Sequence, residues 1–513
     1  MRNKWMWPGV AVLGLSVAAV GLGSGSAIAA SGRLAGGTAV IATSPGLGSN
    51  WFFPMNPIQA DTDINLQVQA LMYKPLLDIT PTDGIDLARS LASRISANST
   101  GTRYVIALNP KWRWSNGAPV TAQDVVFTWT IMKAASAENA PWVFAGSGFG
   151  GIPTRVRSVV AQGAHKVVVT LTKPSNQVWF EHNALAQISP VPEFVWDKYP
   201  HNMTKELSWI ESLANSPGNP VYQIVDGPYR PAKYVVNSYW SFVANPHYDG
   251  HRSTLKGIIF EYETSDAAEF AALKSGTVNL GYVPDSLLGS DRLLRADVLT
   301  PQYTFGFNFI HPNFSPLAPD HIGPILAKLY VRQALQMGID QTGILHTLYH
   351  GLGVPEDSPV PDEPHTIFFD PALKAAPYAF NVARGKKLLE THGWHLVRGV
   401  MTRNGQKLSF PVTYIAGSQT STDVAELIKS DWGREGVDVT LQSLPASTFF
   451  ADVTIKNPSD WAMALGGGWT YEPDYYPTGG GLFMTGAPVN KGSNSFLKYC
   501  IHLSNDVRSG DGS

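Results

Sequence analysis

The run from Lys111 to Trp129 constrains the fold of this chain more than any other stretch. It follows an alternating apolar segment, residues 104–108, whose period of two is that of a strand. Asn116-Gly117 predicts a tight turn, because glycine has no Cβ and asparagine tolerates the left-handed backbone region. Thr121, followed three residues later by Asp124, predicts a capping box at a helix start. The run therefore predicts a strand, a turn and a helix in immediate succession.

The size and charge of the chain limit its class. At 513 residues it is too long for one hydrophobic core, and roughly 150 residues per domain suggests about three units. Charged residues make up 15% of the chain and the net charge is −2. A nucleic-acid-binding protein would carry a basic surface. We therefore expect a multidomain protein that does not bind nucleic acid.

The amino terminus has the pattern of an export signal. Arg2 and Lys4 provide a positive start, residues 10–22 are apolar, and Ala27-Ile28-Ala29 offers a small-x-small cleavage site. The apolar run is short and rich in glycine for a membrane-spanning helix, which needs about 20 apolar residues. We expect a secretory signal that is cleaved after Ala29 or Ala30, with an uncleaved anchor as the alternative. The mature protein is then expected outside the cytoplasm.

Strand and helix patterns recur along the rest of the chain. Apolar or alternating segments predict strands at residues 38–42, 165–172, 258–263, 305–309, 410–415 and 437–441. Helical spacing predicts helices at residues 64–77, 267–275, 330–340, 383–393 and 423–435. Gly276 and Gly436 follow two of these helices, where a glycine in the left-handed region commonly ends a helix. Beyond residue 300 the alternation of strands and helices predicts a mostly parallel sheet with covering helices.

Several short motifs resemble one known family. Beside the Lys111–Trp129 run, they are a Gly-Pro-Tyr turn at residues 227–229, an Asn-Pro-x-Tyr turn at 245–248 and a Val-Arg-Gln-Ala segment at 331–334. A hairpin is expected to join the two turns. Together these motifs resemble the family 5 extracellular solute-binding proteins, the oligopeptide- and dipeptide-binding subunits of ATP-driven importers. The resemblance extends from about residue 38 to residue 496.

This resemblance implies a fold and its division into domains. The expected fold is α/β, periplasmic-binding-protein-like of type II (cluster C), with two hinged α/β lobes and an extra domain. The expected divisions are a signal peptide at 1–29, lobe I at 30–65 and 190–297, lobe II at 66–189, a third α/β domain at 298–478 and a return to lobe I at 479–513. After Phe496 the sequence departs from the family pattern, which suggests a truncated or frameshifted tail.

The resemblance also implies a function. The chain is expected to be the extracytoplasmic substrate-binding subunit of an ABC transporter, which captures short peptides between its lobes and delivers them to a membrane permease with its cytoplasmic ATPase subunits. No cofactor, metal or catalytic residue is implied, and a monomer is expected. Cys500 is the only cysteine. The lipid anchor common in the family would therefore have no attachment point near the expected cleavage site.

The ligand site implied by the family lies around Trp469. In that family a Gly-Trp step, followed three residues later by an acidic residue, lines the cleft, and the carboxylate pairs with the α-ammonium of a peptide. Glu472 holds that position here, Trp469 would form a flat apolar wall, and Tyr471 and Asp474 adjoin them. A buried ammonium needs a charged partner, because its desolvation costs several kcal/mol. The alternative is a solvated loop with a core tryptophan.

Other candidate residues come from separate parts of the chain. Trp51, Phe52 and Phe53 follow the first strand, in a loop that borders the cleft in relatives, although core packing is equally consistent with them. Asn308 matches a family asparagine at the start of the third unit. Arg332 could hold a ligand carboxylate, or form a structural ion pair with a residue such as Asp340.

Three alternative functions stand beside the peptide receptor. Two are receptors of the same family, for oligosaccharides or for metal–chelator complexes. The third is an exported hydrolase, which would need a nucleophile–base pair or a metal site. The sequence has no G-x-S-x-G motif, and no glutamate of an HExxH motif accompanies His346 and His350. The resemblance therefore implies a receptor, and the acidic residue Glu472 favours a peptide over a sugar as its ligand.

Overall fold

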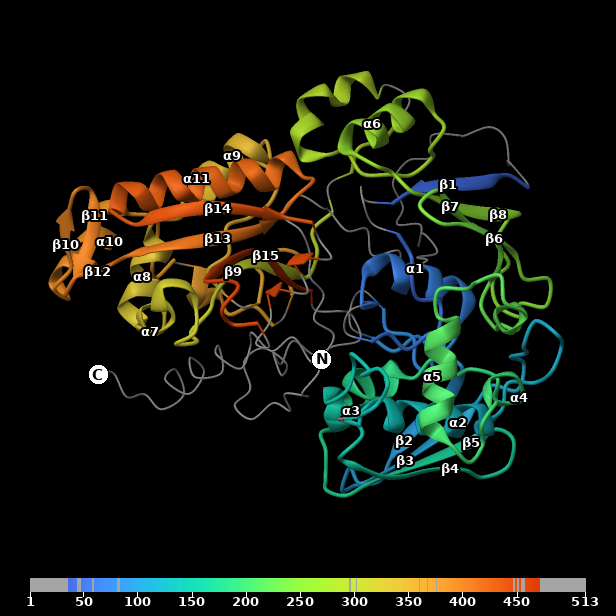
Figure 1. Ribbon diagram of the computed structural model, residues 1–513. Helices are drawn as coiled ribbons and strands as arrows, with labels where there is room; N and C mark the ends of the chain where they lie inside the picture. Colours follow the sequence, from blue (N-terminus) through green and yellow to red (C-terminus); the bar gives the residue numbers. More distant parts are fainter. Residues whose placement is uncertain are drawn as a thin grey trace.

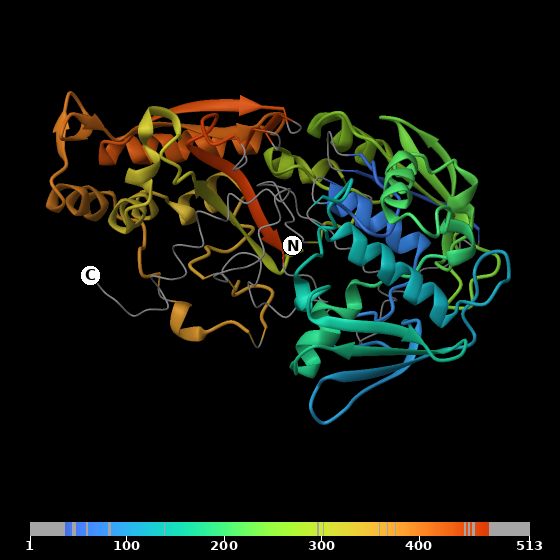
Figure 2. The ribbon, with the colours of Figure 1, turned by 60° about the horizontal axis from the view of Figure 1, so that its bottom comes forward.

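The computed structural model describes residues 36–470. The exceptions are residues 44–47, 58–59, 81–83, 138, 295–296, 301, 359, 367, 375, 446–447, 450–451 and 454–456. The elements from β1 to α6 form one group at the centre and right of Figure 1, and those from β9 onward form a second group at the left. Figure 2, which turns the molecule by 60°, shows the same separation.

The first sheet contains the amino-terminal strand and a meander that follows much later in the chain. Its order is β1-β8-β7-β6, and its strands are β1 (Thr38–Ala42), β6 (Tyr229–Val235), β7 (Tyr239–Ala244) and β8 (Gly257–Glu261). β1 is parallel to β8, and the other pairs are antiparallel. The β6–β7 hairpin joins the Gly-Pro-Tyr and Asn-Pro turns, as predicted. Gly227 packs against the backbone of Leu71 and Met72, where a Cβ would not fit.

The second sheet is antiparallel throughout, and the Lys111–Trp129 run follows its strand β3 (Arg103–Leu108). The order of the sheet is β2-β3-β5-β4, and its other strands are β2 (Ala92–Ala97), β4 (Val156–Ala161) and β5 (Lys166–Leu171). Gly117 has a φ of 87° in the predicted turn. The Thr121 N–H and hydroxyl donate to the Asp124 carboxylate at 2.8 and 3.0 Å, which confirms the capping box of α2 (Ala122–Ala135).

The third sheet belongs to the second group of elements. Its order is β14-β13-β15-β9, and its strands are β9 (Gly306–Pro312), β13 (Ser409–Ile415), β14 (Asp438–Leu444) and β15 (Met463–Thr470). β13 is parallel to both neighbours, and β9 is antiparallel to β15. The predicted parallel sheet is thus confirmed here except at its edge. A small antiparallel sheet contains β10 (His395–Val397), β11 (Val400–Arg403) and β12 (Gln406–Lys407).

Helices cover these sheets and connect them. In the first group they are α1 (Asp63–Met72), α2, α3 (Gln177–Asn183), α4 (Glu193–Trp196), α5 (Met203–Leu213) and α6 (Asp266–Ser275). In the second group they are α7 (Gly323–Leu326), α8 (Leu329–Met337), α9 (Gln341–Leu348), α10 (Val382–Thr391) and α11 (Gln419–Glu435). Short 3-10 segments are η2 (Phe149–Gly151), η3 (Leu185–Gln187), η4 (Pro220–Gln223), η5 (Asp285–Leu293), η6 (Pro319–His321) and η7 (Pro371–Lys374).

Helix ends follow local backbone rules. Gly276 and Gly436 adopt left-handed conformations at the ends of α6 and α11, with φ of 74° and 90°. This confirms both predicted ends. α1, in contrast, stops at Met72, whereas the sequence pattern predicted a helix up to residue 77. Tyr73 is already extended, and Lys74 precedes a proline, which disfavours the helical region for that residue.

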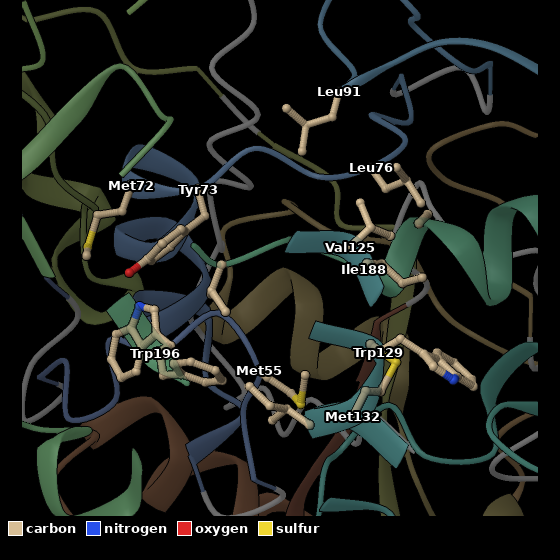
Figure 3. Packing of buried hydrophobic residues seen from close by; sticks show 14 of the residues in the cluster. Met55, Met72, Tyr73, Leu76, Leu91, Val125, Trp129, Met132, Ile188 and Trp196 are labelled. Atoms are coloured by element: carbon tan, nitrogen blue, oxygen red, sulfur yellow. The ribbon is translucent and has the colours of Figure 1, made fainter. Parts of the chain in front are cut away.

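Two large clusters of buried apolar side chains stabilise the two groups. The first extends from Ile41 to Phe260 and is continuous across the first two sheets. Figure 3 shows part of it, where Tyr73 lies near Trp196. The second cluster extends from Phe314 to Leu465 around the third sheet. The predicted domain boundaries within the first group remain predictions.

Within the part of the chain that the structure describes, no helix combines the length and the apolar character needed to cross a bilayer.

Candidate functional site

A cavity of about 1290 Å³ lies beside the third sheet. Its lining combines residues from α6 and the segment that follows it with residues from β9, α8, α9, α11 and β15. Pockets for drug-sized ligands have volumes of about 300–1,000 Å³. The cavity is therefore large enough for a short peptide, and its walls come from both groups of elements.

One wall of the cavity is apolar. Its side chains come from α8, α11 and the third sheet: Leu335, Val424, Ile428, Trp432, Met463 and Leu465. The Trp432 indole N–H donates to the Leu335 carbonyl at 2.8 Å, which fixes α11 against α8. On β9, the rings of Phe307 and Phe309 lie 5.8 Å apart, and both residues also line the cavity. The six side chains belong to the second core and are at most 7% exposed, whereas the rings of Phe307 and Phe309 are only partly buried and can cover apolar parts of a ligand.

The facing wall is attached to the first sheet. The Ala42 N–H donates to the Leu280 carbonyl at 2.8 Å, and the Val40 N–H donates to the Asn279 side chain at 2.9 Å. Asn279 and Leu280 line the cavity. Further along this segment, Val298 is 90% exposed and also belongs to the lining. An exposed valine in a cavity wall leaves apolar surface that a ligand can cover.

Carboxyl groups also line the cavity. Asp285 begins η5, and Glu356 lies in the loop after α9. Burial raises the pKa of each to about 7, and nearby acidic groups act in the same direction. Sequence reasoning did not single out either residue, because burial of a loop carboxylate leaves no local sequence pattern.

Among the predicted site residues, the structure brings Asn308 into this cavity. Asn308 is exposed on β9 and belongs to the lining. Its backbone pairs with Gly468 of β15, and the next pair joins Phe307 with Trp469. The Trp469 backbone therefore lies beside the cavity-lining strand. Its side chain lies outside what the structure describes, as do Tyr471, Glu472 and Asp474, and their roles stay predictions.

Trp51 and Phe52 lie in the hydrophobic core. Trp51 is 6% exposed and Phe52 is 0% exposed. The Trp51 indole N–H donates to the Met55 carbonyl at 3.0 Å. The Phe52 ring makes an edge contact with Tyr222, with centroids 6.2 Å apart. Neither residue lines the cavity, so the structure favours core packing, the alternative weighed for this loop.

Arg332 has partners other than the expected one. Its guanidinium donates to the Leu326 carbonyl at 2.9 Å and lies 5.1 Å from the centre of the Phe314 ring. Asp340 instead caps α9, where its carboxylate accepts from the Gly343 N–H at 2.8 Å. The expected ion pair between Arg332 and Asp340 is therefore replaced by these contacts. Arg332 also lines the cavity.

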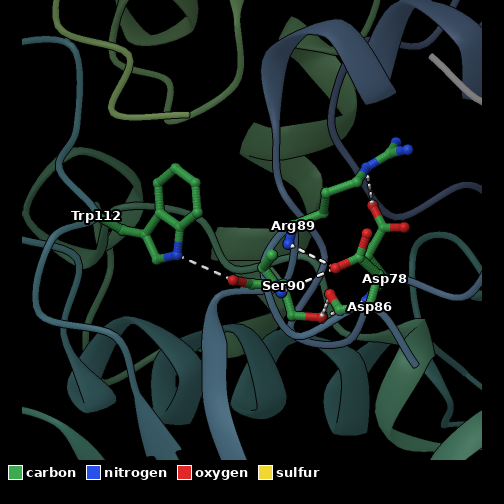
Figure 4. Close-up of polar contacts among 6 residues, drawn as sticks. Asp78, Asp86, Arg89, Ser90 and Trp112 are labelled. Atoms are coloured by element: carbon green, nitrogen blue, oxygen red, sulfur yellow. Dashed lines mark hydrogen bonds and ion pairs between the residues drawn. The ribbon is translucent and has the colours of Figure 1, made fainter. Parts of the chain in front are cut away.

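A second set of buried charged groups lies in the first core, away from the cavity lining. The Lys74 ammonium lies 4.1 Å from the centre of the Trp112 ring, and the Lys74 N–H donates to the Asp226 carboxylate at 3.0 Å. Burial lowers the pKa of Lys74 and raises the pKa of Asp226. Figure 4 shows that the Trp112 indole also donates to the Ser90 carbonyl, at 2.9 Å.

These contacts in the first core have a structural role. Beside them, Arg89 and Asp78 form an ion pair of 3.4 Å. The Asp78 N–H donates to the Ser90 hydroxyl at 2.8 Å. They fix Asp78 and residues 86–90 against Trp112. Among residues 36–470 as described, no three histidine, cysteine, aspartate or glutamate side chains lie close enough together to hold a metal ion.

The sequence of this chain is similar to those of several known proteins. Residues 86–481 match the profile of the bacterial extracellular solute-binding proteins, family 5. The oligopeptide-binding protein AppA of Bacillus subtilis is 22% identical over 427 residues, which cover 82% of this chain and 72% of AppA. A putative ABC transporter peptide-binding protein of Brucella ovis is 25% identical over 344 residues, 66% of this chain and 56% of that protein.

Solved structures show the same fold. The AppA structure with a nonapeptide has a TM-score of 0.71 at 18% identity, and the alignment covers 93% of this chain and 87% of AppA. NikZ of Campylobacter jejuni, in complex with Ni(L-His), also has a TM-score of 0.71, at 19% identity, with 92% and 86% covered. Both are α/β binding proteins, so the expected α/β binding-protein fold of type II is confirmed.

Proposed function

Because this chain belongs to the bacterial extracellular solute-binding proteins of family 5, we propose that it binds short peptides in the cavity beside β9 and delivers them to the membrane permease of an ABC transporter. The observation that carries the proposal is the cavity of about 1290 Å³, whose walls come from both groups of elements. AppA, which has the same fold, was solved with a nonapeptide.

The arrangement of the cavity suggests how binding would change the molecule. Each group of elements has its own large core, so each can move as a unit. A ligand that contacts both walls binds the closed arrangement better than an open one and shifts the population toward it. The permease would then recognise the closed form.

The composition of the walls suits a peptide. The apolar wall can bury side chains, and Asn308 offers an amide at an exposed position on β9. A cavity of this size also leaves space for water, which bridges polar groups of varied ligands at little cost. Such a site tolerates varied side chains while it holds the common backbone.

A substitution in the cavity tests the location of the site. Asn308→Trp would place an indole in the cavity at an exposed strand position, where it needs no space in the core. We expect peptide affinity, measured by isothermal titration calorimetry, to fall at least about tenfold, which corresponds to 1.4 kcal/mol. Val160→Trp, at an exposed position of β4 outside the lining, is the matched control. Equal affinities of both variants and the wild type would place the site elsewhere.

A second candidate ligand class comes from the structural neighbours. NikZ was solved with Ni(L-His), and NikA of Brucella suis with Fe(III)-EDTA. The same calorimetric assay with metal–histidine and metal–EDTA complexes, and with an oligosaccharide, distinguishes these ligands from peptides. Peptides should give the only saturable binding.

The remaining parts of the proposal concern chemistry and location. We expect residues 1–29 to be removed as a signal peptide and the mature chain to act as a monomer. We expect no hydrolysis of bound peptide. Turnover of labelled peptides that a chelator or a serine reagent abolishes would instead identify an exported hydrolase.

A further inference from the structure

The cavity contains two carboxylates that lack a basic partner among the described residues. Asp285 comes from the segment that follows α6, and Glu356 comes from the loop after α9. Each has one oxygen that is buried and forms no hydrogen bond, Asp285 Oδ2 and Glu356 Oε1. A buried carboxylate without a partner is unfavourable, because desolvation destabilises its charged form.

The surroundings of Asp285 are acidic and aromatic. The charge of Asp266 raises its pKa further, beyond the effect of burial. Tyr349 follows α9 and lines the cavity; burial raises its pKa, and the Asp285 charge acts in the same direction. Asp285 therefore lies near an element of the other group.

Glu356 is held in place by the first residue of α9. The Gln341 side-chain amide donates to the Glu356 carbonyl at 3.0 Å, and the Glu356 N–H donates to the Gln341 side-chain oxygen at 2.7 Å. These two bonds fix the Glu356 backbone. Burial raises the pKa of its carboxyl, a hydrogen bond from the Asp362 backbone N–H opposes this shift, and the charges of Asp357 and Asp362 raise the pKa further. The loop thus presents an acid that has a backbone donor but no basic partner among the described residues.

The lining as a whole contains more acidic than basic residues. Its acidic residues are Asp285, Asp291, Asp297, Glu356 and Glu363, and its basic residues are Arg292 and Arg332. Arg332 is directed to the Leu326 carbonyl and the Phe314 ring. A cleft with an excess of one charge attracts ligands of the opposite charge.

We infer that the cavity selects cationic ligands and that Asp285 and Glu356 pair with an ammonium or guanidinium group of the bound peptide. This inference rests on the proposed function and adds the class of peptide. An ammonium in the cavity would give these two carboxyl groups a cationic partner, and charge-assisted hydrogen bonds are the stronger ones in proteins.

The test compares two peptides that differ by one charge. One series carries a lysine at each position in turn, and the matched series carries Nε-acetyllysine, which keeps the length of the side chain and removes its charge. Calorimetry with the wild-type protein should give at least about tenfold tighter binding for the lysine peptide at one or more positions.

Variants assign the preference to the two residues. Asp285→Asn and Glu356→Gln should each reduce the ratio of the two affinities, with little effect on the affinity for the acetylated peptide. Asp249→Asn and Glu211→Gln change the same groups at exposed positions outside the lining and should leave the ratio unchanged. Thermal unfolding checks that each variant folds.

The possible outcomes separate this inference from the function on which it rests. Equal affinities of the wild-type protein for both series would overturn the cationic selectivity and leave peptide binding intact. A preference that survives in both cavity variants would overturn the roles of Asp285 and Glu356. A protein that binds neither series would overturn peptide binding and the inference together.

Discussion

Glu435 is the most isolated buried acid of the second core. It is 0% exposed at the end of α11, and neither carboxyl oxygen has a hydrogen-bond partner within the described residues. Gly385 of α10 and Gly338 after α8 both lie against this carboxyl, so two glycines leave space for it. Burial raises the pKa of Glu435 to about 8, and Asp431 acts in the same direction. The folded protein therefore favours the protonated acid.

The first prediction concerns this residue and pH. An unfolded glutamate has a pKa of about 4.3, so the protonated folded form is fully favoured below that pH. This contribution to stability decreases as the pH rises from about 4.3 toward 8. Glu435→Gln should remove this part of the pH dependence and raise the unfolding midpoint at pH 8 by at least about 2 °C. Scanning calorimetry between pH 5 and 9 measures it, and parallel curves for both proteins would contradict the prediction.

A second prediction at this scale concerns Glu472, which lies outside the described residues. If its carboxylate pairs with the ammonium of a peptide, Glu472→Gln should weaken peptide binding about tenfold or more, because the ammonium loses its charged partner. Glu426→Gln, with 57% side-chain exposure on α11, is the control. Calorimetry that finds the same affinity for both variants would exclude the ammonium-pairing role.

At this scale the sequence indicates residue types better than their places in the fold. Asn308 matches a family position and belongs to the cavity lining, while its contact with a ligand stays a prediction. Asp285 and Glu356 have no local sequence pattern, because their places in the lining depend on burial and on residues distant in the chain. Trp51 and Phe52 were selected as aromatic loop residues, yet an apolar side chain fits a core and a cleft equally well.

At the scale of the elements, Asp124 connects more of the structure than its capping role requires. Its carboxylate accepts from Thr121, as predicted, and also from the Glu193 N–H at 3.0 Å and the Trp114 indole N–H at 3.4 Å. α2, the start of α4 and the turn before α2 therefore share one acceptor. Burial raises the pKa of Asp124, and these hydrogen bonds oppose the shift.

The third prediction follows from this shared acceptor. Asp124→Ala should destabilise the protein by about 2–4 kcal/mol, because it leaves several buried donors without an acceptor. Thr121→Ala should cost only about 1 kcal/mol, since it removes a cap and leaves the other donors satisfied. Urea unfolding measures both. Equal losses would show that Asp124 acts as a helix cap alone.

Local patterns predicted the elements well where the signal lies within a few residues. The capping box of α2 and the glycines that end α6 and α11 are such signals. The relative directions of the strands were harder to predict from the sequence, because a period of two describes parallel and antiparallel strands alike. β2 and β3 are joined by a short turn, which allows antiparallel pairing only.

At the scale of the whole molecule, the protein consists of two groups of elements, each with its own hydrophobic core, and a cavity that residues of both groups line. The fold was predictable because the family motifs are distributed over both groups. The position of the cavity was not predictable, since residues from α6 to β15 meet there only after the chain has folded.

The fourth prediction is that a saturating peptide decreases the radius of gyration in small-angle X-ray scattering, because the two groups close around it. An unchanged radius would contradict closure.

Mass spectrometry of the protein as it is isolated tests peptide binding most directly. In native conditions we expect a complex whose excess mass corresponds to one short peptide, and denaturation should release peptides rich in lysine or arginine. The Asn308→Trp variant should be isolated without this mass. Release of an oligosaccharide or a metal chelate in place of a peptide would show that the protein is not a peptide receptor.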